Sequence, residues 1–326
     1  MKVSVIIPFY NVAPFMEKCA RSLMEQTLQE TEFIFVDDAS PDNSAEILRR
    51  VLADYERDVK IVPHACNKGL PAARNTGLSI AQGDYIYHCD SDDWLEPTML
   101  EDLYTAAIRS GADFAYCDFF LDFGNSRRYM TTPDYPDSET MVKEGFLAGM
   151  MKYNVWNKLV RRNLYDEVSF VRFPDGHSMG EDMTMIALGM RSQGIVRVPK
   201  ALYHYRRNNS NALTSTFSER HLIDIIYNTD RILSLLDQWT IPDKERWAAF
   251  FKLNIKLPLL FSGDYRQYRR WHRWYPEANA YIRQNTVLPS RTVMVQECAR
   301  LHLFPLVWLY AFIVNHLYNK LPLHNQ

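Results

Sequence analysis

The chain reads Tyr85-Ile-Tyr-His-Cys-Asp-Ser-Asp-Asp93 where a short apolar segment runs directly into three carboxylates. The segment Tyr85–Cys89 has the composition of a buried β-strand. Asp90 and Asp92 stand two residues apart on the loop that follows, a spacing that can hold a hard divalent cation and, through it, diphosphate oxygens. An acidic turn that caps the helix expected near Pro97 is the alternative. The surrounding sequence has to distinguish these two interpretations.

Strand and helix patterns alternate over the first 120 residues. Strands are expected at Val3–Ile7, Phe33–Val36, Val59–Pro63, Tyr85–Cys89 and Phe114–Phe119, and helices at about 14–26, 70–81 and 97–109, with a further helix opened by Ser40 as N-cap and Pro41 at its first position. Repeated β-α-β units with short connections imply a mostly parallel sheet that is covered on both faces.

Polar residues follow four of these strand ends. They are Tyr10 and Asn11, Asp37 and Asp38, His64, and Asp90 to Asp93. In open α/β sheets, ligands bind outside the carboxyl ends of the strands. Because the four ends meet at one edge, their convergence favours a binding site over a solvated turn at Asp90–Asp93.

Composition excludes several classes of protein. Apolar residues make up 47% of the 326 residues and charged residues 23%, as in ordinary globular proteins. A net charge of −2 gives no reason to expect nucleic acid as a partner. The five cysteines never form a C-x-x-C pair, which predicts neither a zinc site nor a disulfide framework. The N-terminus reads as a strand and not as a signal peptide, so we expect a cytoplasmic protein or one on the inner face of a membrane.

Four strings occur in order along the chain: Ser4-Val-Ile-Ile-Pro-Phe-Tyr-Asn11, Val36-Asp-Asp-Ala-Ser40, Ala73-Arg-Asn75, and Asp84-Tyr-Ile86 through Asp90-Ser-Asp-Asp93. As a set they resemble the inverting family 2 glycosyltransferases, of the bacterial surface-polysaccharide type. The resemblance is strong over 1–120 and thinner over 121–210. It implies an α/β GT-A domain over 1–215. Beyond about 215 the resemblance gives little, and there the residue pattern itself, helical from about 218 onward, predicts a helical C-terminal region over 216–326.

The resemblance also implies a donor site. Pro8 and Tyr10 match positions that flank the nucleotide base, and Asp38 matches the residue that binds uracil or its equivalent. Arg74 matches a donor-contacting position. Asp90 and Asp92 match a D-x-D motif that binds Mn²⁺ or Mg²⁺, with Asp92 as the direct ligand. From the residues alone, Asp37 or Asp38 also suits the start of the following helix, and Lys68 and Arg74 could lie near phosphates.

The acceptor side is implied by later segments. Asp182 in Met179-Gly-Glu-Asp182 matches the catalytic base, although acidic residues also favour a helix N-terminus. Val155-Trp-Asn-Lys-Leu159 resembles an acceptor-side segment and makes Trp156 and Lys158 substrate-binding candidates; Trp156 could equally belong to the core. In Tyr203-His-Tyr-Arg206, His204 is a candidate for the metal or diphosphate, or else a packed, hydrogen-bonded residue.

The expected reaction moves a sugar from a nucleotide diphosphate, expected to be UDP, to a hydroxyl of a glycan or lipid-linked acceptor. Asp182 would act as general base, and a single displacement would invert the anomeric centre. The alternative is an inactive nucleotide-sugar-binding partner in a glycan-assembly complex, against which the joint presence of Asp38, Asp90, Asp92 and Asp182 argues. A nucleotidyltransferase is disfavoured because the loop after the first strand has neither Gly nor Lys/Arg.

The C-terminal sequence admits two interpretations. Leu303–Val314 is a wholly apolar run of twelve residues, short of the roughly 20 that span a bilayer. Tyr265–Tyr275 interleaves arginines with aromatic residues, as at a membrane interface. Residues 241–326 hold 12 Lys/Arg against 5 Asp/Glu, whereas residues 1–120 hold 10 against 20. Either a membrane surface or an ordinary core helix beside a basic helix is therefore expected here.

Overall fold

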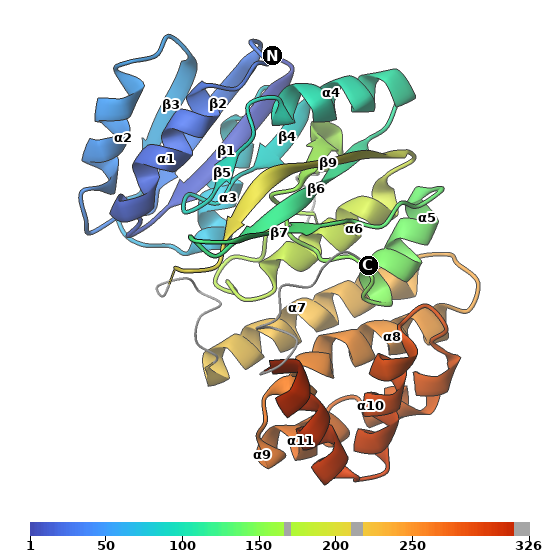
Figure 1. The fold of residues 1–326 in the computed structure, drawn as a ribbon. Helices are drawn as coiled ribbons and strands as arrows, with labels where there is room; N and C mark the ends of the chain where they lie inside the picture. The colour runs from blue at the N-terminus through green and yellow to red at the C-terminus, as the bar shows by residue number, and fades with distance from the viewer. Residues whose placement is uncertain (166–170, 210–217, 316–326) are drawn as a thin grey trace. The chain divides into compact units, whose positions relative to one another are not determined.

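A computed structural model describes residues 1–165, 171–209 and 218–315 (Figure 1). The chain divides into two compact units. The first unit comprises Met1–Glu139 and Tyr153–Ile232, and the second comprises Thr140–Lys152 and Leu233–Gln326. The domain boundary expected between 215 and 216 lies outside the described residues, so the two domain ranges stay a prediction.

One sheet organises the first unit, in the order β3-β2-β1-β4-β8-β6-β9-β5, with β7 paired to β6. Its strands are β1 (Val3–Phe9), β2 (Thr31–Asp37), β3 (Asp58–Pro63), β4 (Tyr85–His88), β5 (Trp94–Leu95), β6 (Phe114–Asp122), β7 (Arg127–Met130), β8 (Lys158–Arg161) and β9 (Ile195–Arg206). The strands β1 to β4 are parallel, as expected. Beyond β4 the sheet is mixed, because β8 runs antiparallel between β4 and β6.

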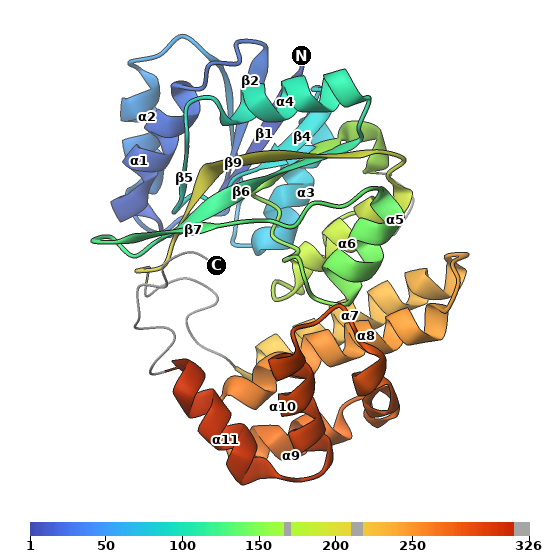
Figure 2. The ribbon, with the colours of Figure 1, turned by 45° about the vertical axis from the view of Figure 1, so that its right-hand side comes forward.

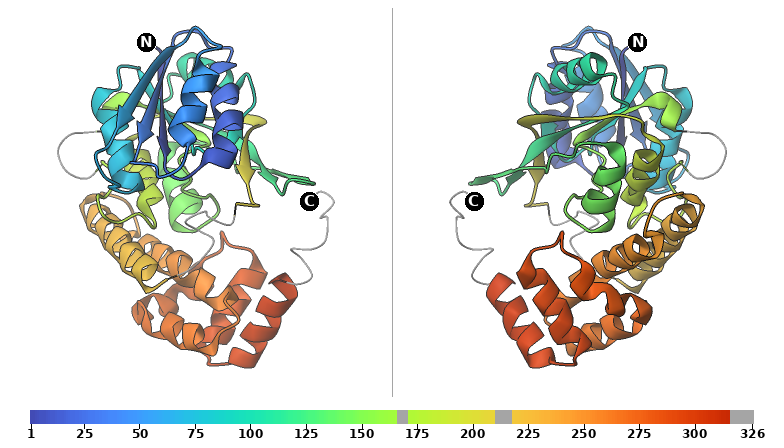
Figure 3. Two further views of the ribbon diagram at one scale, coloured as in Figure 1. Left: turned by 90° about the vertical axis from the view of Figure 1, so that its left-hand side faces the viewer. Right: turned by 90° about the vertical axis from the view of Figure 1, so that its right-hand side faces the viewer.

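Helices cover both faces of the parallel part (Figure 3). The helical segments of the first unit are α1 (Ala13–Met24), α2 (Ser44–Leu52), α3 (Leu70–Ile80), α4 (Met99–Ser110), α5 (Ser138–Thr140), η2 (Arg162–Leu164), η3 (Glu181–Met183), α6 (Thr184–Arg191) and the larger part of α7 (Glu219–Gln238). Figure 3 shows α1 and α2 on one face of β1–β3 and α3 on the other. Every residue of β1 is buried, in agreement with its mostly apolar sequence, VSVIIPF.

The start of α2 differs from the expectation. The helix begins at Ser44, not at Ser40 and Pro41. The Ser40 backbone N–H donates to Asp37 Oδ1 at 2.9 Å, and its hydroxyl donates to Asp42 Oδ1 at 2.8 Å. These bonds close a turn after β2, so Ser40 serves the turn and the helix opens four residues later.

In the described residues of the second unit, every regular element is a helix (Figure 2). Its segments are η1 (Met141–Leu147), α8 (Lys244–Lys256), η5 (Leu257–Phe261), α9 (Tyr265–Arg273), η6 (Pro276–Gln284), α10 (Ser290–Arg300) and α11 (Phe304–Ile313). Trp271, Tyr268 and Phe251 are completely buried in its core. A helical C-terminal region is thereby confirmed. Among the described residues, no helix combines the length and the apolar character needed to cross a membrane.

Candidate functional site

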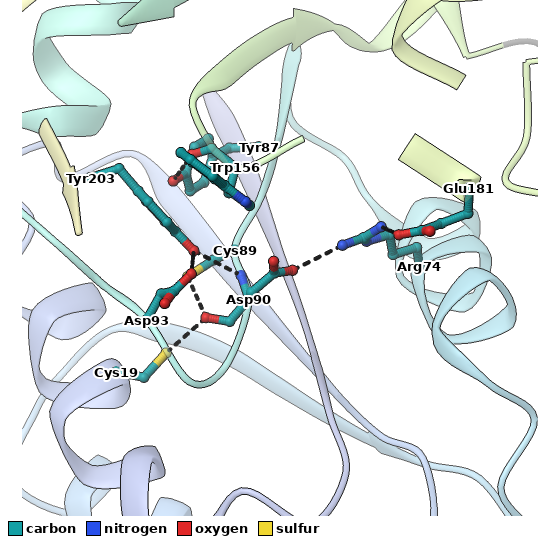
Figure 4. Close-up of polar contacts among 9 residues, drawn as sticks. All are labelled: Cys19, Arg74, Tyr87, Cys89, Asp90, Asp93, Trp156, Glu181 and Tyr203. Carbon is teal, nitrogen blue, oxygen red and sulfur yellow. Dashed lines mark hydrogen bonds and ion pairs between the residues drawn. The ribbon is translucent and has the colours of Figure 1, made fainter. Parts of the chain in front are cut away.

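The acidic loop leaves β4 at the middle of the sheet, where β1 and β8 flank that strand. All four residues of β4 are buried, and the loop returns to the sheet at β5. The Asp90 carbonyl accepts hydrogen bonds from the thiols of Cys89 at 3.4 Å and Cys19 at 3.9 Å (Figure 4). Both bonds tie the loop to the core and leave the Asp90 carboxylate to point away from it.

Arg74 of α3 connects this loop to a distant part of the chain. Its side chain is 2% exposed. Nη2 donates to Asp90 Oδ1 at 2.9 Å and Nη1 donates to Glu181 Oε1 at 2.6 Å (Figure 4). Glu181 opens the short helix η3 directly before α6. The guanidinium therefore brings the D-x-D loop and the Glu181–Asp182 turn, which are far apart in sequence, to one site.

Negative charge is concentrated here. Burial, followed by the charge of Asp90, raises the pKa of Asp92, and burial together with both of those aspartates raises the pKa of Asp93 well above its ordinary value. Burial also raises the pKa of Glu181 to about 7, against the opposing charge of Arg74. A cation bound at this loop would relieve the repulsion among its carboxylates.

The side chains at this loop fit a cation that is coordinated partly by the protein and partly by a bound ligand. Hydrogen bonds from Arg74 and from Asn209 occupy one carboxylate oxygen each of Asp90 and Asp92. Within the described parts of the chain, no group of three His, Cys, Asp or Glu side chains is placed to hold a metal ion. Two carboxylates would need water or diphosphate oxygens to complete a coordination shell. The metal roles of Asp90 and Asp92 stay predictions.

Asp38 is buried directly after β2, and both of its carboxylate oxygens have partners within the chain. Its Oδ1 accepts from the Lys68 backbone N–H at 2.8 Å and contacts His64 Nδ1 at 2.7 Å, and its Oδ2 accepts from the Gly69 N–H at 2.8 Å. These bonds fix the loop that leads into α3. The uracil-binding role expected for Asp38 stays a prediction, and the structure gives this side chain a second, structural function.

Tyr10 and Pro8 flank the end of β1. Pro8 is buried within the strand opposite Val36, whereas Tyr10 is 46% exposed just beyond it. An exposed ring at a strand end is free to contact a ligand, as expected for a residue beside the nucleotide base. Both base-flanking roles stay predictions.

Trp156 stands two residues before Lys158, which is the first residue of β8. The Trp156 ring stacks on Tyr203 at 4.5 Å and on Tyr205 at 5.2 Å between ring centroids, and it is only 6% exposed. Lys158 Nζ donates to the Asn154 carbonyl at 2.6 Å. Burial lowers the pKa of Lys158 to about 7, and the charge of Asp182 opposes this shift. Lys158 and Asp182 are thus electrostatic neighbours, while the substrate roles of Trp156 and Lys158 stay predictions.

His204, a residue of β9, packs against aromatic side chains of the two neighbouring strands, β5 and β6. Its ring stacks on Trp94 and Phe120, with centroids 4.7 and 4.9 Å away. Its Nε2 lies 2.6 Å from Glu96 Oε1, and burial lowers its pKa. These contacts match the packed, hydrogen-bonded alternative. The proposed role of His204 as a metal ligand stays a prediction that none of them supports.

Three further residues hold the acidic loop and were not predicted from the sequence. Tyr203 Oη donates to Asp93 Oδ2 at 2.7 Å, the Arg206 Nε donates to the Asp92 carbonyl at 2.8 Å, and Asn209 Nδ2 donates to Asp92 Oδ2 at 2.7 Å. All three lie on β9 or just after it. The alternating residues of Tyr203-His-Tyr-Arg206 predict a strand. They do not show that this strand contacts the acidic loop.

Known proteins resemble this chain in sequence. The family model described as Glycosyl transferase family 2 matches residues 4–173. The uncharacterized glycosyltransferase EpsJ of Bacillus subtilis is 34% identical over 223 residues, which cover 65% of this chain and 62% of that protein. The glycosyltransferase GlyG of Streptococcus pneumoniae is 32% identical over 236 residues, covering 69% and 77%. The match thus spans less than two thirds of EpsJ.

A solved structure shares the fold. Residues 1–349 of TarS from S. aureus, in complex with UDP-GlcNAc, superpose with a TM-score of 0.68 at 18% identity, covering 97% of this chain and 91% of that one. The likeness extends over both units of the chain and confirms the expected α/β fold with a helical C-terminal region.

Proposed function

The chain belongs to glycosyltransferase family 2, and on this premise we propose that it transfers a sugar from a nucleotide diphosphate, UDP in the first instance, to a hydroxyl of a glycan or lipid-linked acceptor. The product would be a bacterial surface polysaccharide or related glycan, formed with inversion. One observation carries the proposal: Arg74 joins Asp90 of the D-x-D loop to Glu181 beside Asp182. The binding of UDP-GlcNAc by TarS supports the choice of donor.

The residues of this chain have separate tasks in the proposed reaction. Asp90 and Asp92 would hold Mn²⁺ or Mg²⁺, and the bound ion would supply positive charge to stabilise the departing diphosphate. Asp182 would accept the proton of the acceptor hydroxyl while that hydroxyl attacks the anomeric carbon from the face opposite the diphosphate. One displacement then gives inversion without a covalent intermediate on the protein.

Asp182 is a better candidate for the base than its neighbour. The Glu181 carboxylate is buried against Arg74, whereas Asp182 is only half-buried. A base has to reach the acceptor, and a carboxylate that is committed to a buried guanidinium is poorly placed to do so. Glu181 would instead hold Arg74 in position.

The test is the pair Asp182→Asn and Glu181→Gln. We expect Asp182→Asn to lower turnover by roughly 10²–10⁴, because it keeps the shape and removes the proton acceptor, while UDP affinity measured by calorimetry barely changes. Glu181→Gln keeps a hydrogen-bond acceptor for Arg74 and should cost much less. A larger loss from Glu181→Gln would move the base by one residue. Binding of nucleotide sugars without turnover by the wild type would favour the inactive-partner alternative.

We also propose that the second unit binds the inner face of a membrane. Five large apolar side chains at or near α11 are between 41% and 53% exposed: Leu303, Leu306, Trp308, Leu309 and Phe312. Exposed apolar side chains in this number mark an interaction surface. The surplus of basic residues over 241–326 is complementary to anionic lipid headgroups.

A further inference from the structure

One face of α7 is hydrogen-bonded to the segment that carries Glu181 and Asp182. Asp224, Asn228 and Arg231 are spaced at i, i+4 and i+7, so they lie on the same side of the helix. Asp224 is 3% exposed and Asn228 is fully buried. All three side chains bond to residues within 172–184. None of them belongs to the donor or acceptor site described above.

Two of these side chains bond to the backbone of a single residue, Met179, one on each of its two peptide units. Asp224 Oδ2 accepts from the Met179 backbone N–H at 3.3 Å, and Asn228 Nδ2 donates to the Met179 carbonyl at 3.1 Å. Asp224 Oδ1 also contacts His177 Nδ1 at 3.1 Å. Because backbone groups outside regular structure need partners from elsewhere, these bonds replace the ladder that a helix or strand would supply. Met179 is therefore fixed from both sides, three residues before Asp182.

The third side chain joins the two ends of the segment. Arg231 Nη1 donates to the Arg172 carbonyl at 3.0 Å, and Nη2 donates to Thr184 Oγ1 at 2.7 Å. Thr184 is the first residue of α6 and is completely buried. One guanidinium thus spans the segment from its start to the helix that follows Asp182.

Gly180 completes the arrangement. Its φ of +82° lies in the left-handed region, which side chains disfavour. A Cβ at this position would lie 3.1 Å from Met183 Cε and 3.7 Å from the Asn228 Cβ. The chain therefore turns sharply at 180, closely packed against α7, and enters η3 with Glu181 and Asp182 in a defined orientation.

We propose that α7 positions the turn 177–184, with Asp224, Asn228 and Arg231 as positioning residues for Asp182. The proposal rests on the role of Asp182 in the proposed function. A general base has to be held within fractions of an ångström of its productive position, and the turn has little regular structure to do this by itself. The helix that follows the α/β fold in sequence thereby becomes part of the catalytic apparatus.

The experiment compares Asn228→Ala and the size-conserving Asp224→Asn with Ile223→Ala, a control on the same helix at a 54% exposed side chain. Hydrogen exchange of the 172–184 peptide is measured together with kcat on the best nucleotide sugar and with UDP affinity. In both test variants we expect faster exchange and a kcat lower by roughly 10- to 100-fold. UDP affinity should hold within about twofold, because the donor-site residues are untouched. Ile223→Ala should match the wild type in all three.

The outcomes separate the two proposals. Unchanged exchange in folded Asp224→Asn and Asn228→Ala would show that α7 does not hold the turn. Faster exchange with an unchanged kcat would overturn the positioning role. If Asn228→Ala does not fold, the exchange rate and kcat of Asp224→Asn alone test the positioning role. A wild type without transfer on any donor would remove the proposed function, and the exchange data would then decide by themselves whether α7 holds the turn.

Discussion

At the scale of single residues, Arg74 is central to how the candidate site is assembled. A buried guanidinium is tolerated only with partners, and removal of one partner of a buried ion pair is strongly destabilising. Here Glu181 and Asp90 each take one of its Nη groups. The donor contact expected for Arg74 stays a prediction. Its observed bonds give it a role in assembling the site, because they fix the distance between the D-x-D loop and the predicted base.

Asp92 gives a test of the metal assignment. We expect Asp92→Ala to abolish the Mn²⁺ dependence of UDP binding, because a site with few protein ligands loses one hard carboxylate. Asp90→Ala should be milder if Asp90 binds the metal through water. Calorimetry of UDP with and without Mn²⁺ measures both variants. An Asp92→Ala protein with wild-type affinity in Mn²⁺ would exclude Asp92 as a ligand.

Lys158 predicts a pH dependence of stability. Its pKa falls from 10.5 to about 7 because the side chain is buried. Between these values the unfolded chain binds one proton more than the folded chain, so this group makes stability rise with pH by about 1.4 kcal/mol per unit. The contribution of Lys158 to the free energy of unfolding is therefore fully present above the unfolded pKa of 10.5. It is lost as the pH falls through the folded pKa of about 7.

Denaturant unfolding between pH 7.5 and 9.5 measures this effect. The stability of Lys158→Met should rise less steeply with pH than that of the wild type, by about the same slope of roughly 1.4 kcal/mol per unit. Lys200→Met, at a side chain that is 59% exposed, is the control and should keep the wild-type slope. Parallel curves for Lys158→Met and the wild type would mean that Lys158 is charged in the folded protein.

At the scale of elements, one carboxylate organises the N-termini of α1 and α2. Asp42 Oδ2 accepts from the Ala13 N–H at 2.8 Å, while Oδ1 accepts from the Ser44 N–H at 3.1 Å. Both donors stand at helix starts, where backbone N–H groups have no partner within the helix and the dipole favours a negative charge. Asp42 therefore replaces the capping role that was expected of Ser40.

Loss of this carboxylate should be measurable. We expect Asp42→Ala to lower the free energy of unfolding by roughly 1–3 kcal/mol, since two helix starts lose a charged acceptor. Asp54→Ala, at a side chain that is 59% exposed, should change it by no more than about 0.5 kcal/mol. Equal denaturation midpoints for the two variants would show that Asp42 does not act as a shared cap.

At the scale of the whole molecule, the two ends of the chain differ in chemistry. The acidic part, residues 1–120, carries strands β1 to β5 and the D-x-D loop, and the basic C-terminal part carries the exposed apolar side chains of α11. Val307 and Ala311, on the other side of α11, are buried. The helix thus has one face packed in its unit and another open. The packed face agrees with the core interpretation of the run Leu303–Val314, and the membrane contact of the open face stays a proposal.

Deletion of 301–326 should move the protein from the membrane fraction to the soluble one and leave donor hydrolysis intact; residues 316–326 of this segment lie outside the described part of the chain. A finer variant replaces Leu306, Leu309 and Phe312 by Gln and spares the buried Val307 and Ala311. We expect it to fold normally and to lose binding to phosphatidylglycerol vesicles in a sedimentation assay. The membrane proposal would be contradicted if this variant bound vesicles as well as the wild type does. It would also be contradicted if the truncated chain aggregated and the intact protein did not bind vesicles.

Local patterns were sufficient to predict much of the fold. The strands β1 to β4, the helices between them and the convergence of their carboxyl ends follow from apolar runs, helical periodicity and turn residues, which act over a few neighbouring positions. The acidic loop at 90–93 was predicted for the same reason. The position of this loop depends only on strand β4 and on the residues that directly follow it.

The tertiary structure alone decided which distant groups meet. No local pattern pairs Arg74 with Glu181, Asn209 with Asp92, or Asn228 with Met179. Nor does any local pattern show that His204 lies between two aromatic rings. These contacts depend on where β9 and α7 return to the α/β core. The paired residues lie 49 to 117 positions apart in the sequence, and secondary-structure periodicity, which acts over a few neighbouring positions, carries no information on such pairs.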